Sequence, residues 1–253
     1  MRNIISGEIY KLCKSKYFYI GLALTSGIII MVFALTRVMA IYMTDVPDVT
    51  PKNALDIIAF IYPECKLSIL LAFMSCLLVN NDIRTKTINI MISASTRHKI
   101  YLAKLCMGFI LSFSIIFVVL VTAIVIGMLF LGDFSFIGSN ILFFIHFLIS
   151  HTFISFATCS IAIMLAFMVK KVTVAIPVCV LCEFVIVGIA DGLSFINKAF
   201  ANIDTFIPAQ MITIFTLPEH FYENNIILYM LVCAGIIILT SAFGIFAFKK
   251  TDF

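Results

Sequence analysis

Long apolar runs, separated by short segments that carry the charges, are the dominant feature of the sequence. Four runs of at least 20 residues contain no Asp, Glu, Lys or Arg. A helix of about 20 residues crosses a hydrocarbon core of about 30 Å, because each residue adds 1.5 Å. Two shorter apolar segments complete a set of six predicted membrane-spanning helices. Their approximate limits are 17–42, 63–81, 105–132, 139–169, 172–190 and 225–248.

Two other segments are too apolar to be simple loops. Residues 1–16 carry an apolar stripe at helical spacing, which predicts an amphipathic helix lying in the membrane interface. Residues 191–224 are also rich in Phe and Ile and are broken by prolines, which predicts a re-entrant or interfacial segment between the last two spans. The residues of the N-terminal stripe are Ile4, Ile5, Ile9, Leu12 and Cys13.

The composition agrees with a membrane protein and excludes several other classes. Of the 253 residues, 63% are hydrophobic and 12% are charged, against about 45–50% and about 25% in soluble domains. A soluble enzyme, a disordered scaffold and a nucleic-acid-binding domain therefore fit poorly. The sequence predicts an all-α integral membrane protein with a single transmembrane domain, residues 1–253.

The distribution of the basic residues predicts the orientation. With six spans both termini share one side of the membrane, and that side holds thirteen of the 17 Lys and Arg residues. The opposite side holds nine of the 13 Asp and Glu residues. Since basic residues are retained in the cytoplasm, we expect a multi-pass protein of the cell membrane with cytoplasmic N- and C-termini.

No motif for catalysis or for nucleotide binding is found. The sequence lacks GxxxxGK[ST], HExxH and GxSxG. Cys179 and Cys182 form a lone CxxC inside the fifth predicted span, without the further ligands of a zinc site. His146 and His151 are five residues apart and so lie on different helical faces. We therefore expect no bound metal, no cofactor and no enzymatic activity of the chain itself.

Two acidic residues are candidates for a transport pathway or gate. Glu183 lies deep in the fifth predicted span, where a charge is costly unless it is protonated, paired or hydrated. It is either a pathway residue or a protonated glutamate that bonds a neighbouring helix. Glu64 lies in the first turn of the second span, where the helix dipole stabilises a carboxylate. We expect Glu64 to lie at the outer rim of the membrane.

The cytoplasmic segment 82–104 between the second and third spans is basic and amphipathic. Ile83, Ile88, Met91 and Ile92 recur at helical spacing, which predicts a helix parallel to the membrane. The basic segment either only sets the orientation of the chain in the membrane, or its helix receives force from a cytosolic motor.

The same segment resembles the inner loop of the ABC-2 permeases, the membrane subunits of type-2 ABC transporters. That loop runs from an acidic residue through Thr-Ile, a pair of leucines and a Pro-small-Arg turn to a lysine. This chain has Asp instead of the usual Glu, Lys86 where Gly is common, and no Pro before the arginine. The corresponding residues are Asp82, Thr87-Ile88, Ile90 to Ile92, Ser95-Thr96-Arg97 and Lys104.

The resemblance extends to the N-terminal helix, the six spans and the outer segment, and it implies a half-transporter. Two permease subunits, identical or homologous, would pair and dock on a dimer of cytosolic ABC ATPases that hold ATP and Mg²⁺. ATP-driven closure would push on the inner loop. The residues expected to couple to the ATPase are Asp82, Arg84, Thr87, Ile88, Arg97 and Lys104.

The length and the lack of a large outer domain are most similar to bacterial bacitracin-type and lantibiotic-immunity permeases. This implies export of an amphipathic peptide or antibiotic, and so a role in antimicrobial peptide resistance. Within the family, an ion, a drug or a lipid-linked glycan is the alternative cargo. Outside it, a membrane-embedded enzyme using Glu183 with His146 or His151, or a non-transporting scaffold subunit, stays open.

Overall fold

The structure, a computed structural model, describes residues 2–42, 54–132, 141–169, 171–196, 206–208, 210–211 and 226–250. Helices make up almost all of these residues, and none of them belongs to a β-strand. The elements, in which η marks a π-helical turn, are α1 (Arg2–Lys14), α2 (Lys16–Tyr42), α3 (Ala54–Asp56), η1 (Ile57–Ile61), α4 (Tyr62–Glu64), α5 (Leu67–Arg84), α6 (Thr87–Ala94), α7 (Arg97–Ile126), η2 (Gly127–Leu131), α9 (Ile141–Val169), α10 (Val172–Ile196) and α12 (Ile226–Lys250).

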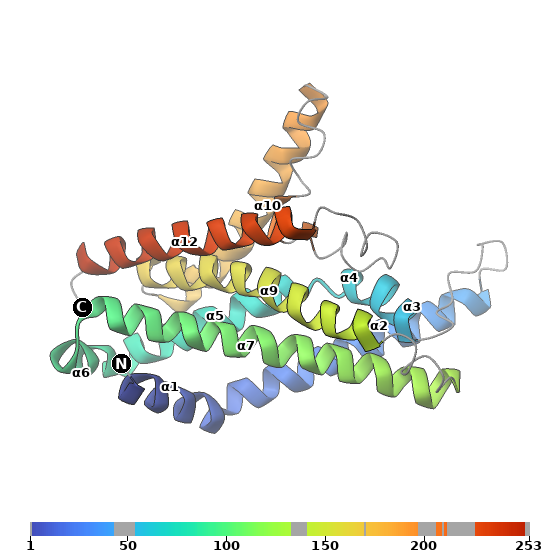
Figure 1. Ribbon diagram of the computed structural model, residues 1–253, viewed down its shortest axis with the longest axis horizontal. Coiled ribbons are helices and arrows are strands. Elements are labelled where there is room, and N and C mark those ends of the chain that lie inside the picture. Colours follow the sequence, from blue (N-terminus) through green and yellow to red (C-terminus); the bar gives the residue numbers. More distant parts are fainter. Residues whose placement is uncertain are drawn as a thin grey trace.

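Six helices are long and apolar enough to cross a membrane, namely α2, α5, α7 with η2, α9, α10 and α12. The prediction of an all-α chain with six such helices is therefore confirmed. Five of them lie side by side in a bundle, whereas the C-terminal half of α10 stands away from it (Figure 1). Large apolar side chains on the outside of the bundle are exposed, as expected for surfaces that face lipid.

Helix α9 lies at the centre of the bundle and packs against α5, α7, α10 and α12. Small side chains on α9 allow this close approach: Ala157, Cys159, Ala162 and Ala166 are all buried. On α7, Gly108 faces Ile163, and a Cβ at position 108 would come within 2.8 Å of the Ile163 Cδ1 atom. Tight packing of this kind replaces the hydrophobic effect as the force between helices in lipid.

The residues just before the second span are also helical and buried. Ile57, Ile58 and Ile61 in η1 belong to the apolar core, and this segment packs against α2 and α7. The left-handed backbone of Lys66, with φ of 44°, separates α4 from α5. The second membrane helix therefore begins at Leu67 rather than at the predicted Pro63.

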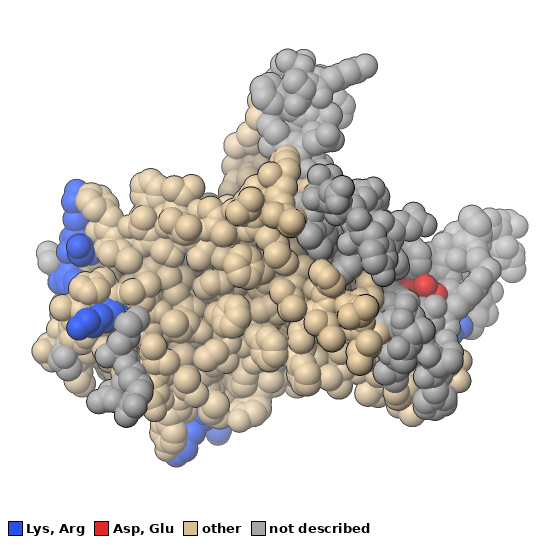
Figure 2. Space-filling model, viewed as in Figure 1, with Lys and Arg blue, Asp and Glu red and all other residues tan. Residues whose placement is uncertain are grey.

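The predicted inner segment 82–104 is mostly helical. Helix α5 continues to Arg84, α6 is a separate helix, and α7 begins at Arg97, so only residues 85–86 and 95–96 connect them. Helices α1 and α6 and the C-terminal end of α12 all lie at the same end of the bundle (Figure 1). Most of the Lys and Arg side chains visible in Figure 2 gather at this end, which we call the basic end.

Within the segment 191–224, residues 191–196 continue α10 beyond the predicted end of the fifth span at residue 190, and Phe206 and Met211 lie against α12. Phe206 packs on the ring of Tyr229 with 5.4 Å between centroids, and the Met211 Sδ atom lies 3.5 Å from the Cys233 Sγ atom. Both Met211 and Cys233 are fully buried. The re-entrant or interfacial path expected for the remainder of this segment lies outside the described residues.

Candidate functional site

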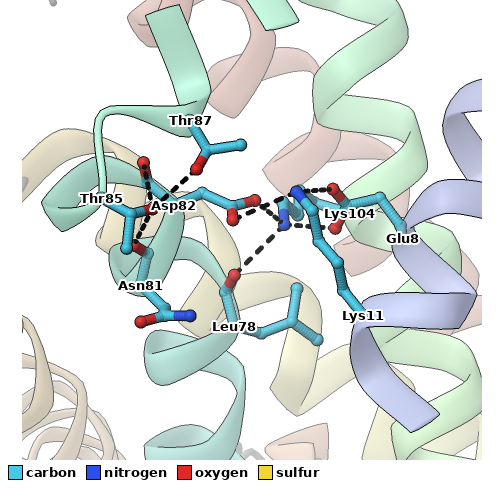
Figure 3. Close-up of polar contacts among 8 residues, drawn as sticks. All are labelled: Glu8, Lys11, Leu78, Asn81, Asp82, Thr85, Thr87 and Lys104. Atoms are coloured by element: carbon cyan, nitrogen blue, oxygen red, sulfur yellow. Dashed lines mark hydrogen bonds and ion pairs between the residues drawn. The ribbon is translucent and has the colours of Figure 1, made fainter. Parts of the chain in front are cut away.

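Four charged side chains meet inside the basic end, where α1 crosses α5 and α7 (Figure 3). Lys104 of α7 forms ion pairs with both Glu8 of α1 and Asp82 of α5, and its Nζ also donates to the Leu78 carbonyl oxygen at 3.2 Å. The Lys11 Nζ lies 3.0 Å from the Glu8 Oε1 and 3.3 Å from the Asp82 Oδ1. We call Glu8, Lys11, Asp82 and Lys104 the charged cluster.

The charged cluster is buried although all four groups ionise in water. Glu8 is 4% exposed, Asp82 5% and Lys104 2%, and only Lys11 reaches the solvent. Burial of an unpaired charge costs several kcal/mol, so these groups need compensation. Each lysine contacts both carboxylates, so that the two positive and two negative charges alternate and cancel.

The environment of Lys11 shows the strength of this compensation. Burial lowers the pKa of the Lys11 amine, but the charges of Asp82 and Glu8 and the hydrogen bonds to both raise it more, so that the pKa lies above its ordinary value of 10.5. The cation of Lys11 is thus held by the two carboxylates. The charged cluster joins α1, α5 and α7 through charged side chains.

A tight turn connects the charged cluster to α6. Thr85 follows α5, and its hydroxyl donates to the Asn81 carbonyl oxygen at 2.9 Å and lies 2.8 Å from the Thr87 hydroxyl. Lys86 adopts a left-handed conformation with φ of 57°, which glycine adopts more easily. The backbone at Lys86 therefore has a conformation that glycine favours. Glycine is common at this position in the ABC-2 permeases, which this segment resembles.

Helix α6 has one buried and one exposed side. Ile88 is 2% exposed and packs into the apolar cluster at this end of the bundle, with Met91 and Ile92 against the same cluster. On the other side Asn89 and Ile90 face outward, and the Ile90 side chain is 69% exposed. An isolated helix of eight residues is unstable in water, so α6 depends on these contacts and on its two short connections.

Arg97 connects the start of α7 to the end of α12. The Arg97 Nη1 donates to the carbonyl oxygens of Phe248 at 3.0 Å and Lys249 at 2.8 Å. These carbonyl groups belong to the last turn of α12, where backbone carbonyl groups have no N–H donor within the helix. The positive guanidinium also complements the negative end of the α12 dipole.

The structure therefore brings together some of the residues expected to couple to an ATPase and separates others. Asp82 and Lys104 form an ion pair inside the bundle, and Arg97 contacts α12. Thr87 is the first residue of α6, Ile88 is buried, and Arg84 is exposed. The side chains of Glu64 on α4 and Glu183 on α10, the two candidate pathway residues, lie outside the described residues.

Sequence reasoning did not select Glu8, although a signal was present. Glu8 is the only acidic residue among the first sixteen, and it lies one helical turn from both Ile4 and Leu12 of the predicted apolar face. An isolated carboxylate beside such a face, in an otherwise basic segment, indicates a buried partner of opposite charge.

The histidines and the CxxC pair occupy separate environments. His151 is fully buried and packs on the rings of Tyr62 and Phe147, whereas His146 is exposed. The Cys179 Sγ lies 3.4 Å from the Cys76 Sγ of α5. Within the described part of the chain, no three His, Cys, Asp or Glu residues are placed to hold a metal ion.

Comparison with known proteins identifies no relative: no model of a known protein family matches the sequence, and no curated protein matches it. The resemblance to the ABC-2 permeases therefore depends on the residues of this chain alone.

Proposed function

We propose that the chain is the membrane-spanning permease subunit of an ATP-driven ABC exporter, with α6 as the helix that docks on a cytosolic ATPase. The observation that carries the proposal is a short helix fixed at the basic end, with its outer side open for contact. This arrangement suits the transmission of force, because α6 is joined to α5 and α7 by connections of only two residues each.

The contacts around α6 support a rigid connection to four other helices. The charged cluster joins the end of α5 to α1 and α7, and Arg97 joins the start of α7 to α12. A push on α6 would therefore move the inner ends of α1, α5, α7 and α12 together. We expect Asp82 and Lys104 to act as positioning residues within this unit, and Ile90 and Asn89 to face the ATPase.

The proposal includes the orientation and the partners that the resemblance implies. The basic end would lie in the cytoplasm, in accordance with the positive-inside rule. Two permease subunits would pair, and each would meet one ATPase subunit that binds ATP and Mg²⁺. The cargo expected from the resemblance is an amphipathic peptide or antibiotic that moves outward.

The first test is purification of the chain from its native membrane in mild detergent, with identification of the proteins that accompany it. A stoichiometric soluble subunit with a GxxxxGK[ST] motif is the expected result. A chain that purifies without any ATPase, even after crosslinking, contradicts the proposal.

A second test locates the contact. A photo-crosslinking amino acid at position 90 should capture the ATPase, because Ile90 is exposed on the outer side of α6. The matched control is position 142, since Leu142 is 72% exposed but lies at the start of α9, at the opposite end of the bundle. Equal capture from both positions contradicts the docking role of α6.

A third test concerns transport itself. The Asp82→Lys variant should reach the membrane but fail to couple ATP hydrolysis to export of an amphipathic peptide from vesicles. Normal export by this variant contradicts the role of the charged cluster.

A further inference from the structure

A cavity of about 340 Å³ lies between α10 and α12, away from the charged cluster. Its inner wall is formed by α5 and α9, including Ala72 and Ala162. Its sides are formed by three residues of α10 and three of α12, namely Cys179, Cys182, Ile186, Ile236, Leu239 and Thr240. Residues 206–208 cover one side. A volume of this size is within the range of small-molecule binding sites.

The cavity offers almost no hydrogen-bonding groups to an occupant, because its hydroxyls are bonded within the protein. The Thr240 hydroxyl donates to the Ile236 carbonyl oxygen at 2.8 Å and lies 3.0 Å from the Ser160 hydroxyl. The Thr158 hydroxyl bonds to the Ile154 carbonyl oxygen at 3.4 Å. A peptide backbone in the cavity would leave its own N–H and C=O groups without partners, which costs several kcal/mol per group in lipid.

The cavity also lies at membrane depth and close to the lipid-facing surface. Ile236 is ten residues beyond the start of α12, about 15 Å along the helix axis and therefore near the middle of a hydrocarbon core of about 30 Å. Two of its lining residues, Leu239 and Ile186, are 60% and 47% exposed on the outside of the bundle. Hydrocarbon is the medium that meets this part of the surface.

We propose that this cavity binds one acyl chain of a bilayer phospholipid, which enters from the side between α10 and α12. The site recognises a hydrocarbon tail by shape and by the absence of competing polar groups, and the headgroup and second chain stay in the bilayer. The inference is independent of the proposed transport function, because it concerns a lipid site on the single chain.

The test uses the purified chain in nanodiscs of phosphatidylglycerol, with a trace of the same lipid carrying a photoreactive diazirine in the middle of one acyl chain. After illumination, adducts are mapped by mass spectrometry. The residues of α10 and α12 that line the cavity should carry several-fold more adduct than the equally apolar, exposed residues Phe109, Phe113 and Phe117 on α7.

Variants separate a specific site from ordinary lipid contact. Leu239→Trp and Ile186→Trp should obstruct the cavity and lower the adduct yield to that of the α7 surface. Leu231→Trp on α12 and Leu181→Trp on α10 are the matched controls, because both residues are exposed but neither lines the cavity. These controls should keep the full yield.

Three outcomes overturn the proposal. One is labelling spread evenly over α7, α10 and α12 and unaffected by Leu239→Trp and Ile186→Trp. Another is a yield that the control variants reduce as much as the cavity variants do. The third is labelling of the lining residues by a diazirine fatty acid but not by the diazirine phospholipid, which would assign the site to a free fatty acid.

Discussion

The Arg97 guanidinium binds the carbonyl oxygen of Phe248 at 3.0 Å and lies over the ring of the same residue, with 5.9 Å from Cζ to the ring centroid. The two residues are 151 positions apart in the sequence. The Arg97 side chain thus caps the C-terminal end of α12 and fixes it to the start of α7. In the proposed transporter, this contact would link the last membrane helix to α7, which follows the docking helix α6 after a connection of two residues.

Replacement of Arg97 should loosen this connection. The Arg97→Ala variant loses two charge-assisted hydrogen bonds, and we expect the free energy of unfolding to fall by about 1–3 kcal/mol. Thermal unfolding in detergent, followed by circular dichroism, measures the change. Lys99→Ala is the control, because Lys99 is exposed two residues further along α7. An equal loss in both variants contradicts a specific role of Arg97.

Removal of Lys104 alone should be more damaging than removal of all three buried charges of the charged cluster. The Lys104→Met variant leaves Glu8 and Asp82 buried side by side with only Lys11 as counter-charge, and an uncompensated buried charge costs about 3–5 kcal/mol. In the triple variant Glu8→Gln, Asp82→Asn and Lys104→Met, no buried charge is left, so much of the stability should return. Chemical unfolding of both proteins measures the difference. If the triple variant is less stable than Lys104→Met, the charges are not what makes the single change costly.

The contact of α1 with the bundle should weaken at strongly alkaline pH. The pKa of Lys11 is raised above 10.5 in the folded protein, so its contribution is complete below pH 10.5 and is lost as the pH rises through the raised value. A fluorophore on the exposed Cys13, in a Cys106→Ser background, reports the position of α1. With Lys11→Met, the contact should be weaker at neutral pH and its alkaline transition smaller. An identical transition in both proteins would assign the effect to another group.

The sequence predicted α1 well as an element but not the side it buries. The apolar stripe correctly predicted a helix, yet Ile9 and Cys13 of that stripe are exposed while Glu8 is buried. The reason is that α1 packs on the polar inner ends of α5 and α7, where Lys104 forms ion pairs with both Glu8 and Asp82. Hydrophobic periodicity describes the lipid-facing side of such a helix, but it contains no information about a charged surface formed by residues 70 to 100 positions away.

The six spans, in contrast, could be predicted because they do not depend on distant residues. Length and hydropathy depend on local composition, and the hydrocarbon core imposes the same requirement on every helix. The start of α5 was one exception, since the buried turns of α3, η1 and α4 precede it and only the left-handed Lys66 separates them. Which helices enclose a cavity, or which carbonyl groups Arg97 meets, depends on helix packing and could not be derived from one sequence.

The left-handed residue before α6 provides a test of the backbone. At position 86 we expect Lys86→Gly to be more stable than Lys86→Ala by about 1 kcal/mol, because a Cβ is disfavoured at φ of 57°. The comparison of glycine with alanine removes the contribution of the lysine side chain. Paired thermal unfolding of the two variants measures the difference. Alanine equal to or better than glycine would mean that residue 86 does not adopt the left-handed conformation.

A glycine on α12 should be sensitive to a single added methyl group. A Cβ at position 244 would overlap the Tyr101 side chain, whose hydroxyl donates to the Thr240 carbonyl oxygen at 3.2 Å and whose ring packs on Phe167 at 5.3 Å. Alanine gains about 1 kcal/mol of helix propensity over glycine, but overpacking a buried contact costs about 1–3 kcal/mol. Since Tyr101 is fixed on both sides, we expect Gly244→Ala to destabilise the protein.

Gly235 on the same helix is the matched control, because a Cβ there meets nothing within 4 Å. We expect Gly235→Ala to be neutral or stabilising in the same unfolding measurement, so only Gly244→Ala should lower the stability. A Tyr101→Leu background should remove the penalty of Gly244→Ala, since the obstructing ring is absent. If Gly244→Ala remains equally harmful in that background, its cost does not come from the contact between α7 and α12.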